Sequence, residues 1–102
     1  DVGCGNGQLL YELSVSGFKD LHGFDPFISC SVEVSDSFKL WKKRIEDSDL
    51  LFDVIMMHHS FEHMEDPQAI LSTCFDHLNP GGKLLIRCPV ADAQVWREKG
   101  VF

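Results

Sequence analysis

The sequence opens with DVGCGNGQLLYEL (residues 1–13), in which three glycines alternate with other residues before a leucine-rich run. The leucines recur at the spacing of one helix face, and Gly17 is placed to end that helix. Asp1-Val2 reads as the last two residues of a strand. The stretch therefore predicts a strand end, a glycine loop and a helix in direct succession.

Two further strands are expected in the first half of the chain. Residues 21–24 form a short candidate that ends at Asp25-Pro26, because the nitrogen of Pro26 cannot donate to a ladder. Residues 38–42 form a weaker candidate. The serine-rich stretch between them, residues 27–37, has a mixed period and is interpreted as a loop or a broken helix.

The second half carries stronger signals. Residues 52–57 form a nearly continuous apolar run, as expected for a parallel strand covered on both faces. Asp66-Pro67 supplies an N-cap and a first-turn proline for a helix. Turn residues at 79–82 precede another apolar strand over 83–88. The expected apolar face of the helix consists of Ile70, Leu71, Cys74, Phe75 and Leu78.

The order of these elements predicts an α/β fold with a parallel sheet and helices on both faces. The strand, helix and strand of residues 52–88 form one crossover unit, for which a right-handed connection is expected. Residues 91–99 are expected to begin another helix. A length of 102 residues allows one domain.

Composition narrows the range of partners. Sixteen acidic against nine basic residues give a formal net charge of −7, which repels phosphate backbones, so nucleic acid is not an expected partner. The basic run Lys42-Lys43-Arg44 is interpreted as a solvated strand end. No apolar run approaches the ~20 residues that span a bilayer, so no membrane association is expected. Four cysteines without a CxxC pair favour reduced thiols and a cytoplasmic protein.

The spacing of the glycines and of nearby acids indicates the ligand. Gly3, Gly5 and Gly7 form GxGxG, whereas the dinucleotide fingerprint requires GxGxxG. A carboxylate at Asp1, beside the loop, would repel a pyrophosphate and attract a cationic ligand. Asp25 follows at about the 20-residue offset of acids that bond ribose hydroxyls in such folds. A cationic ligand that carries a ribose is therefore predicted.

These motifs resemble those of class I S-adenosylmethionine (SAM) dependent methyltransferases. The resemblance covers DVGCGNG at residues 1–7, GFDP at 23–26, FDVIMM at 52–57, EHMEDP at 62–67 and LNPGG at 78–82. It implies a Rossmann-like fold and SAM as the cofactor. Residues 1–102 would be a partial core, from the end of the first strand through the fifth, truncated at both ends, with the first strand between those ending at Asp25 and His58.

The resemblance also implies a set of binding residues. The methionine part of SAM would lie among Asp1, Gly3, Cys4, Gly5 and Gly7. Asp25 would hold the ribose, with Pro26 and Phe27 beside it. The segment that borders the adenine matches Ile45 and Glu46. The segment after the fourth strand, which includes His58 and His59, would also lie beside SAM.

The His58–His63 segment allows several interpretations. His63 is a candidate general base for a hydroxyl or amine acceptor, with Glu62 orienting it. His59 to His63 also matches HxxEH, the inverted zinc-peptidase signature, but that motif needs a helix interior and a third ligand, so no metal site is expected. His58 can equally be a strand-end residue that packs and hydrogen bonds.

The acceptor is not specified by this core. Methyl transfer needs alignment rather than a covalent residue or a metal, so a sequence can reveal the cofactor without the acceptor. A small-molecule acceptor is expected, without indication of an oxygen, nitrogen or carbon nucleophile or of the oligomeric state. A non-catalytic Rossmann-like binding module is the alternative, because fold alone does not establish activity.

Overall fold

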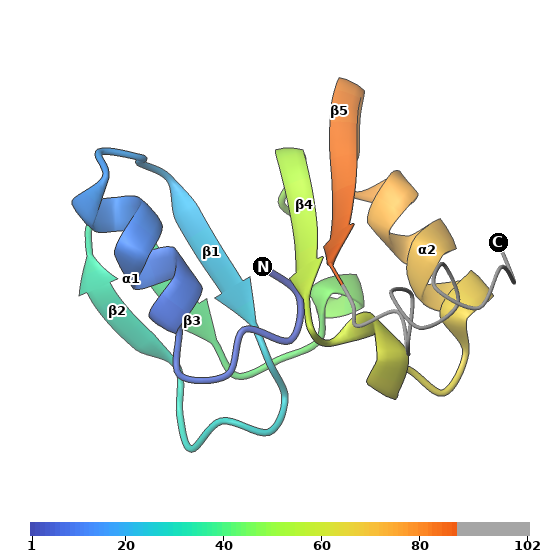
Figure 1. Ribbon diagram of the computed structural model, residues 1–102, viewed down its shortest axis with the longest axis horizontal. Coiled ribbons are helices and arrows are strands. Elements are labelled where there is room, and N and C mark those ends of the chain that lie inside the picture. The colour runs from blue at the N-terminus through green and yellow to red at the C-terminus, as the bar shows by residue number, and fades with distance from the viewer. Residues whose placement is uncertain (88–102) are drawn as a thin grey trace, which may run out of the picture.

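The computed structural model describes residues 1–87 as alternating strands and helices (Figure 1). The elements in chain order are α1 (Gln8–Val15), β1 (Leu21–Phe24), β2 (Val32–Ser35), β3 (Phe38–Trp41), the 3-10 helix η1 (Ile45–Asp47), β4 (Phe52–His58), the 3-10 helix η2 (Phe61–His63), α2 (Pro67–Asp76) and β5 (Leu78–Arg87). The expected helix over residues 91–99 and the last residue of the expected strand, Cys88, lie outside the described residues. No helix of residues 1–87 is long and apolar enough to cross a membrane.

β1, β3 and β2 form one three-stranded sheet in that order. β1 and β3 are parallel, with Leu21 opposite Phe38, and β2 is antiparallel to β3. The interpretation of residues 27–37 as a loop or broken helix is therefore wrong for Val32–Ser35, which form a strand. Val32-Glu33-Val34-Ser35 alternates apolar and polar residues over only four positions, and all four are exposed, so ladder pairing with β3 defines the strand.

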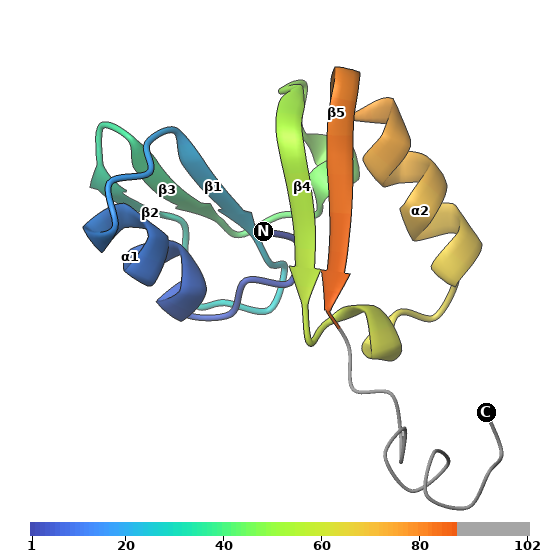
Figure 2. The same cartoon turned by 45° about the horizontal axis from the view of Figure 1, so that its top comes forward.

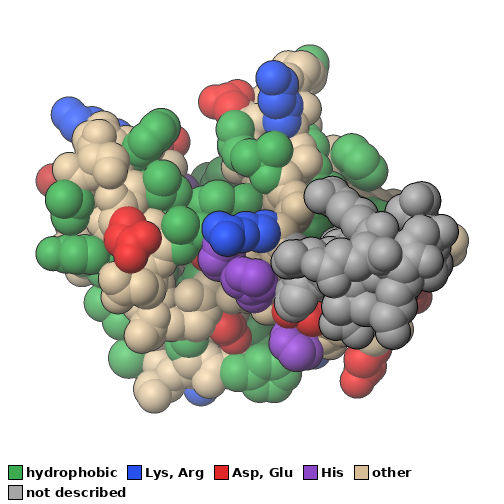
Figure 3. All heavy atoms as spheres, in the orientation of Figure 1, with side chains coloured by type: hydrophobic (Ala, Val, Ile, Leu, Met, Phe, Trp, Pro, Cys, Tyr) green, Lys and Arg blue, Asp and Glu red, His purple; other side chains and the backbone are tan. Residues whose placement is uncertain are grey.

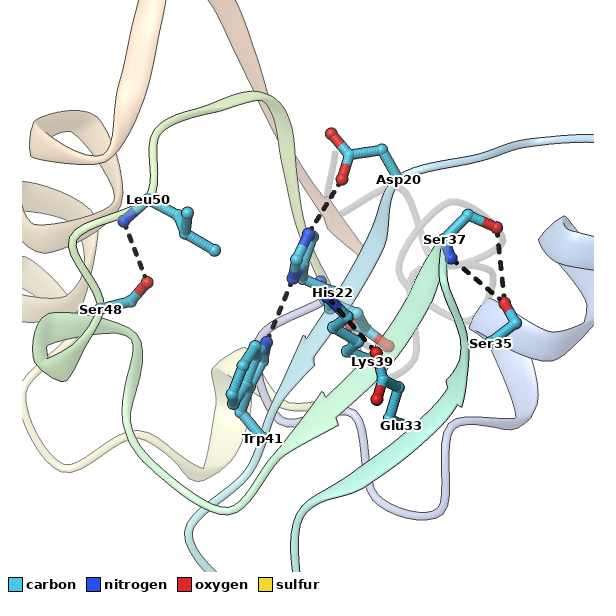
Figure 4. A network of polar contacts seen from close by, with 10 residues as sticks. Asp20, His22, Glu33, Ser35, Ser37, Lys39, Trp41, Ser48 and Leu50 are labelled. Carbon is cyan, nitrogen blue, oxygen red and sulfur yellow. Dashed lines mark hydrogen bonds and ion pairs between the residues drawn. The ribbon is translucent and has the colours of Figure 1, made fainter.

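A hydrogen-bonded chain lies across the first sheet (Figure 4). The indole Nε1–H of Trp41 donates to His22 Nδ1 (3.1 Å), and His22 Nε2 lies 3.0 Å from Asp20 Oδ1. An indole only donates, so Nδ1 of His22 accepts and Nε2 carries the proton that reaches Asp20. His22 thus has a structural role in this sheet.

β4 and β5 form a second, parallel sheet, and α2 connects them. Asp66 caps α2 as expected, since its Oδ1 accepts from Ala69 N–H (3.1 Å). β5 begins at Leu78, earlier than the expected residue 83, because the turn residues form an irregularity inside the strand. The register jumps there, and Gly81 adopts φ +80°, a left-handed conformation that suits glycine.

Asp1 and Val2 join the two sheets. Phe24 N–H donates to Asp1 O (2.9 Å), and Val2 N–H donates to Met56 O (2.9 Å). The N-terminus lies between β1 and β4 in both ribbon views (Figures 1 and 2). The order across the molecule is therefore β2, β3, β1, Asp1-Val2, β4 and β5. Apart from the β2 edge, this is the order of a doubly wound sheet, and Asp1-Val2 occupy the position that the resemblance implies for the first strand.

Two apolar cores lie on opposite faces of these strands. Ile55 and Met57 of β4 pack in a cluster with Cys74 of α2, whereas Met56 packs against a cluster that contains Leu10 of α1. Because successive side chains of a strand point to opposite faces, α1 and α2 cover different faces. The α/β architecture with helices on both faces is confirmed.

Two details of the expected core differ. Val54 is 51% exposed, so this position of β4 is not covered on both faces as expected. Phe75 is 61% exposed, although it was assigned to the apolar face of α2. Cys74 takes the central position on that face and is completely buried, so Phe75 turns away.

Candidate functional site

A cavity of about 540 Å³ opens at the carboxyl ends of β1 and β4. Its walls come from the first residues of the chain, the segment after β1, η1, the segment around η2, and α2. This is the edge at which open α/β sheets bind ligands, and the volume is in the range of small-molecule sites. Histidine side chains gather on this face where β4 ends (Figure 3).

Asp25 connects the end of β1 to the glycine loop. Its Oδ2 accepts from Gly5 N–H (2.9 Å), and its Oδ1 accepts from Phe27 N–H (2.9 Å). The Asp25-to-Phe27 bond forms a local turn that brings Pro26 and Phe27 to the cavity wall, where Phe27 is 90% exposed. Asp25 therefore shapes the site and also borders its interior.

The glycine loop turns its amides toward the protein. Gly3 N–H donates to Phe24 O (2.7 Å), Gly7 N–H donates to Cys4 O (3.0 Å), and Gly5 N–H is held by Asp25. All three glycines have positive φ. A Cβ added at Gly5 would meet nothing within 4 Å, so the outer side of the loop is open at that position.

Cys4 and Gly7 face the protein rather than the cavity. A Cβ at Gly23 would lie 2.7 Å from Cys4 Sγ, so the thiol packs directly on the backbone of β1. Burial raises the pKa of the Cys4 thiol to about 11, so it is a neutral thiol at physiological pH. A Cβ at Gly7 would lie 3.0 Å from Leu40 Cδ1, which brings the start of α1 close to β3.

Asp1 occupies the junction between the sheets. Its backbone pairs with β1, and its side chain lines a separate small cavity between β1 and β4. The Oδ1 of Asp1 is buried without a hydrogen-bond partner. The structure thus brings the backbone of this predicted residue to the glycine loop while its carboxylate lies outside the large cavity.

The η1 segment forms another wall. Ile45 is 2% exposed and belongs to the core, and Glu46 beside it pairs with Arg44 at 4.0 Å. All three residues line the cavity. Ile45 and Glu46 were predicted from the resemblance, whereas Arg44 was assigned to a solvated run.

The segment after β4 bends sharply at His59. This residue adopts φ +56°, and its N–H donates to Arg87 O (2.6 Å). His59 and the buried Ser60 line the cavity, whereas His58 packs edge-on against His59 with ring centroids 4.5 Å apart and does not line it. A left-handed residue that is not glycine is uncommon and often marks a functional segment.

His63 borders the cavity from η2. Its Nε2 lies 3.6 Å from Glu62 Oε1, and its side chain is 79% exposed. Glu62 does not line the cavity. HxxEH zinc sites need an α-helix, but η2 is a single 3-10 turn and His59 precedes it in a left-handed conformation. Within residues 1–87 no three His, Cys, Asp or Glu side chains cluster as a metal site.

The sequence-predicted residues thus fall into two groups. Those that line the cavity are Gly3, Asp25, Pro26, Phe27, Ile45, Glu46, His59 and His63. Those that do not line it are Asp1, Cys4, Gly5, Gly7, His58 and Glu62. Sequence reasoning missed Arg44, Ser60 and the α2 residues Ala69, Ile70 and Thr73. The three α2 residues follow an i, i+1, i+4 spacing and so lie on one side of the helix. This spacing points to a binding surface only once the position of the cavity is known.

Comparisons with known proteins agree with this geometry. Residues 1–100 match a family described as “Methyltransferase domain”. A tRNA U34 carboxymethyltransferase of Nautilia profundicola is 30% identical over 96 aligned residues, which cover 84% of this chain and 32% of that protein. A ubiquinone biosynthesis O-methyltransferase of Xylella fastidiosa is 28% identical over 100 aligned residues, covering 84% of this chain and 39% of that protein. The chain spans about a third of the length of such relatives. No solved structure matches it significantly.

Proposed function

Because this chain belongs to the methyltransferase domain family, we propose that it is the SAM-binding core of an enzyme that transfers a methyl group to an acceptor. The observation that carries the proposal is Asp25, whose carboxylate stands at the cavity and holds the glycine loop at the same time. The relatives are about three times as long, so residues 1–102 would form only a partial core of the whole enzyme.

The chemistry of Asp25 fits a ribose. An ionised carboxylate offers about four lone-pair sites, and two backbone N–H groups use one on each oxygen. Each oxygen of Asp25 therefore keeps acceptor capacity for one of two neighbouring hydroxyls. Pro26 and Phe27 would flank the sugar, and the apolar side chain of Ile45, with Glu46 beside it, would border the adenine.

The glycine loop fits an amino-acid moiety better than a pyrophosphate. Sites for phosphate need several free N–H groups aimed at the ligand. Here the amides of Gly3, Gly5 and Gly7 are bonded within the protein. The open space beside Gly5 would admit the methionine part of SAM.

Residues after β4 would serve the transfer itself. SAM supplies a methyl group already activated by its sulfonium leaving group. His63 would accept a proton from the attacking hydroxyl or amine, and Glu62 would orient the imidazole from 3.6 Å. His59 would border the cofactor, with His58 packed behind it. The rest of the enzyme would exclude water and complete the alignment of the acceptor with the methyl group.

A small molecule is the proposed acceptor. Among residues 1–87, the cavity wall carries the carboxylates of Asp25, Glu46, Glu65 and Asp66 against one guanidinium, that of Arg44. This surplus of negative charge disfavours a phosphate backbone. Ubiquinone O-methyltransferases among the relatives support the same class, whereas the tRNA U34 carboxymethyltransferases favour RNA as the second candidate.

Calorimetry on the intact protein tests the cofactor assignment. SAM and S-adenosylhomocysteine should bind with micromolar affinity, while NAD should bind at least about a hundredfold more weakly, a difference of about 2.7 kcal/mol. Transfer of labelled methyl from SAM into pooled small hydroxyl, amine and carbon acceptors, against pooled tRNA, then separates the acceptor classes. Binding of SAM without methyl transfer to any pool would favour the non-catalytic binding module. Zinc retained by the purified protein, with loss of activity on chelation, would favour the HxxEH zinc peptidase.

A further inference from the structure

Ser60 makes a buried contact between two segments that are far apart in the sequence. Its hydroxyl donates to the backbone carbonyl of Val2 (2.8 Å), across 58 residues. The residue is 8% exposed. This bond ties the segment that follows β4 to the residue that precedes the glycine loop.

The same side chain packs against the first glycine of the loop. A Cβ added at Gly3 would lie 2.6 Å from Ser60 Cβ and 3.0 Å from Ser60 Oγ. Real Cβ atoms essentially never approach that closely, so only glycine fits opposite Ser60. The loop and the serine therefore occupy complementary space, and each fixes the position of the other.

The bend at His59 directs Ser60 into this contact. With φ +56° at His59, the strand ends abruptly and the next side chain turns inward. The bond from His59 N–H to Arg87 O anchors the bend to the end of β5. A left-handed conformation is unfavourable for a residue with a side chain, so the surrounding contacts must hold His59 in it.

We propose that Ser60 is a positioning residue that holds the glycine loop at its working distance from the β4 segment, and so sets the affinity for SAM. The inference rests on the proposed function. Gly3, His59 and Ser60 all line the cavity, and the Ser60 hydroxyl is bonded to Val2 O. A change at Ser60 would therefore alter the position of the glycine loop relative to the segment after β4.

Ser48 provides a matched control. It is 7% exposed, its hydroxyl also makes one bond to the backbone, from Leu50 N–H (3.1 Å), and it does not line the cavity. Ser48→Ala and Ser60→Ala remove the same atom from similar burial. We expect both to lower the thermal midpoint by a few degrees.

The two variants should differ in cofactor binding. In the intact protein, Ser60→Ala should raise the Kd of SAM and of S-adenosylhomocysteine by up to about tenfold, because a glycine loop without this bond adopts the binding geometry in a smaller fraction of molecules, whereas Ser48→Ala should leave both within about twofold. Hydrogen exchange of residues 1–7 should accelerate only in Ser60→Ala. Equal weakening by both variants would mean that Ser60 acts through general stability, and unchanged affinity in Ser60→Ala would also overturn the proposal. Failure of the wild type to bind SAM would instead refute the proposed function.

Discussion

Asp25 is the residue at which cofactor binding is most directly testable. We expect Asp25→Asn to weaken SAM and S-adenosylhomocysteine together. Asparagine keeps the shape of the side chain and one acceptor oxygen, but it replaces the other oxygen with an NH₂ donor and removes the charge. One of the two proposed ribose hydroxyls would therefore lose its acceptor, and the other would face a weaker one.

The magnitude follows from the bonds at this carboxylate. A hydrogen bond to a charged group contributes about 1.5–3 kcal/mol, and the lower value suits a half-buried side chain. Loss of one such bond raises Kd by about tenfold. Gly5 N–H and Phe27 N–H compete for the remaining oxygen, so the unliganded protein should also lose about 1 kcal/mol of stability.

Asp20→Asn is the matched control. Asp20 lies just before β1, at the opposite end from Asp25, and its carboxylate contacts His22 rather than the large cavity. Both substitutions change the net charge by one unit, so an effect of net charge alone would appear in both variants. Asparagine also tolerates the φ of +59° at Asp20.

Titration calorimetry on the intact protein, with melting of each variant, is the assay. Asp25→Asn should raise both Kd values at least about tenfold, and Asp20→Asn should leave them within about twofold. An Asp25→Asn protein that is folded and binds SAM like the wild type would refute the placement of the ribose. Equal weakening by the two variants would show that charge alone, and not a hydrogen bond, accounts for Asp25.

Three further outcomes are expected. In urea unfolding, Gly3→Ala should lower the free energy of unfolding by about 1–3 kcal/mol more than Gly17→Ala. Both glycines have positive φ, but only a Cβ at position 3 meets a neighbouring side chain. Equal losses of stability in the two variants would contradict the close contact between Gly3 and Ser60. His63→Gln should lower turnover by about 10²–10⁴ while SAM affinity stays within about twofold, and unchanged turnover would remove it as a base. Burial raises the pKa of Cys74 to about 11, so the folded state binds the extra proton and stability should fall as pH rises from about 9 through about 11. At pH 8 iodoacetamide should label the exposed Cys30 and spare Cys74, as mass spectrometry would detect.

Local signals in the sequence were sufficient for most of the fold. The cap at Asp66, the leucine spacing after the glycine loop and the apolar run of β4 depend on neighbouring residues, and the structure has each element where it was expected. β2 was missed because its apolar–polar alternation lasts for only four residues inside a serine-rich stretch. Its partner β3 follows after only Asp36-Ser37, which is not one of the glycine-containing two-residue turns that mark a hairpin in a sequence.

The candidate site, like the fold, was predicted in part from the sequence. The sequence by itself determined the glycine loop, Asp25 at a strand end and their common edge of the sheet, because backbone conformation and strand order follow from residue type and element order. Only the tertiary structure decided that the thiol of Cys4 packs inward and that Ser60 reaches Val2 across 58 residues. Side-chain contacts of this kind depend on how whole elements pack, since close packing leaves each side chain few positions and no local pattern encodes them.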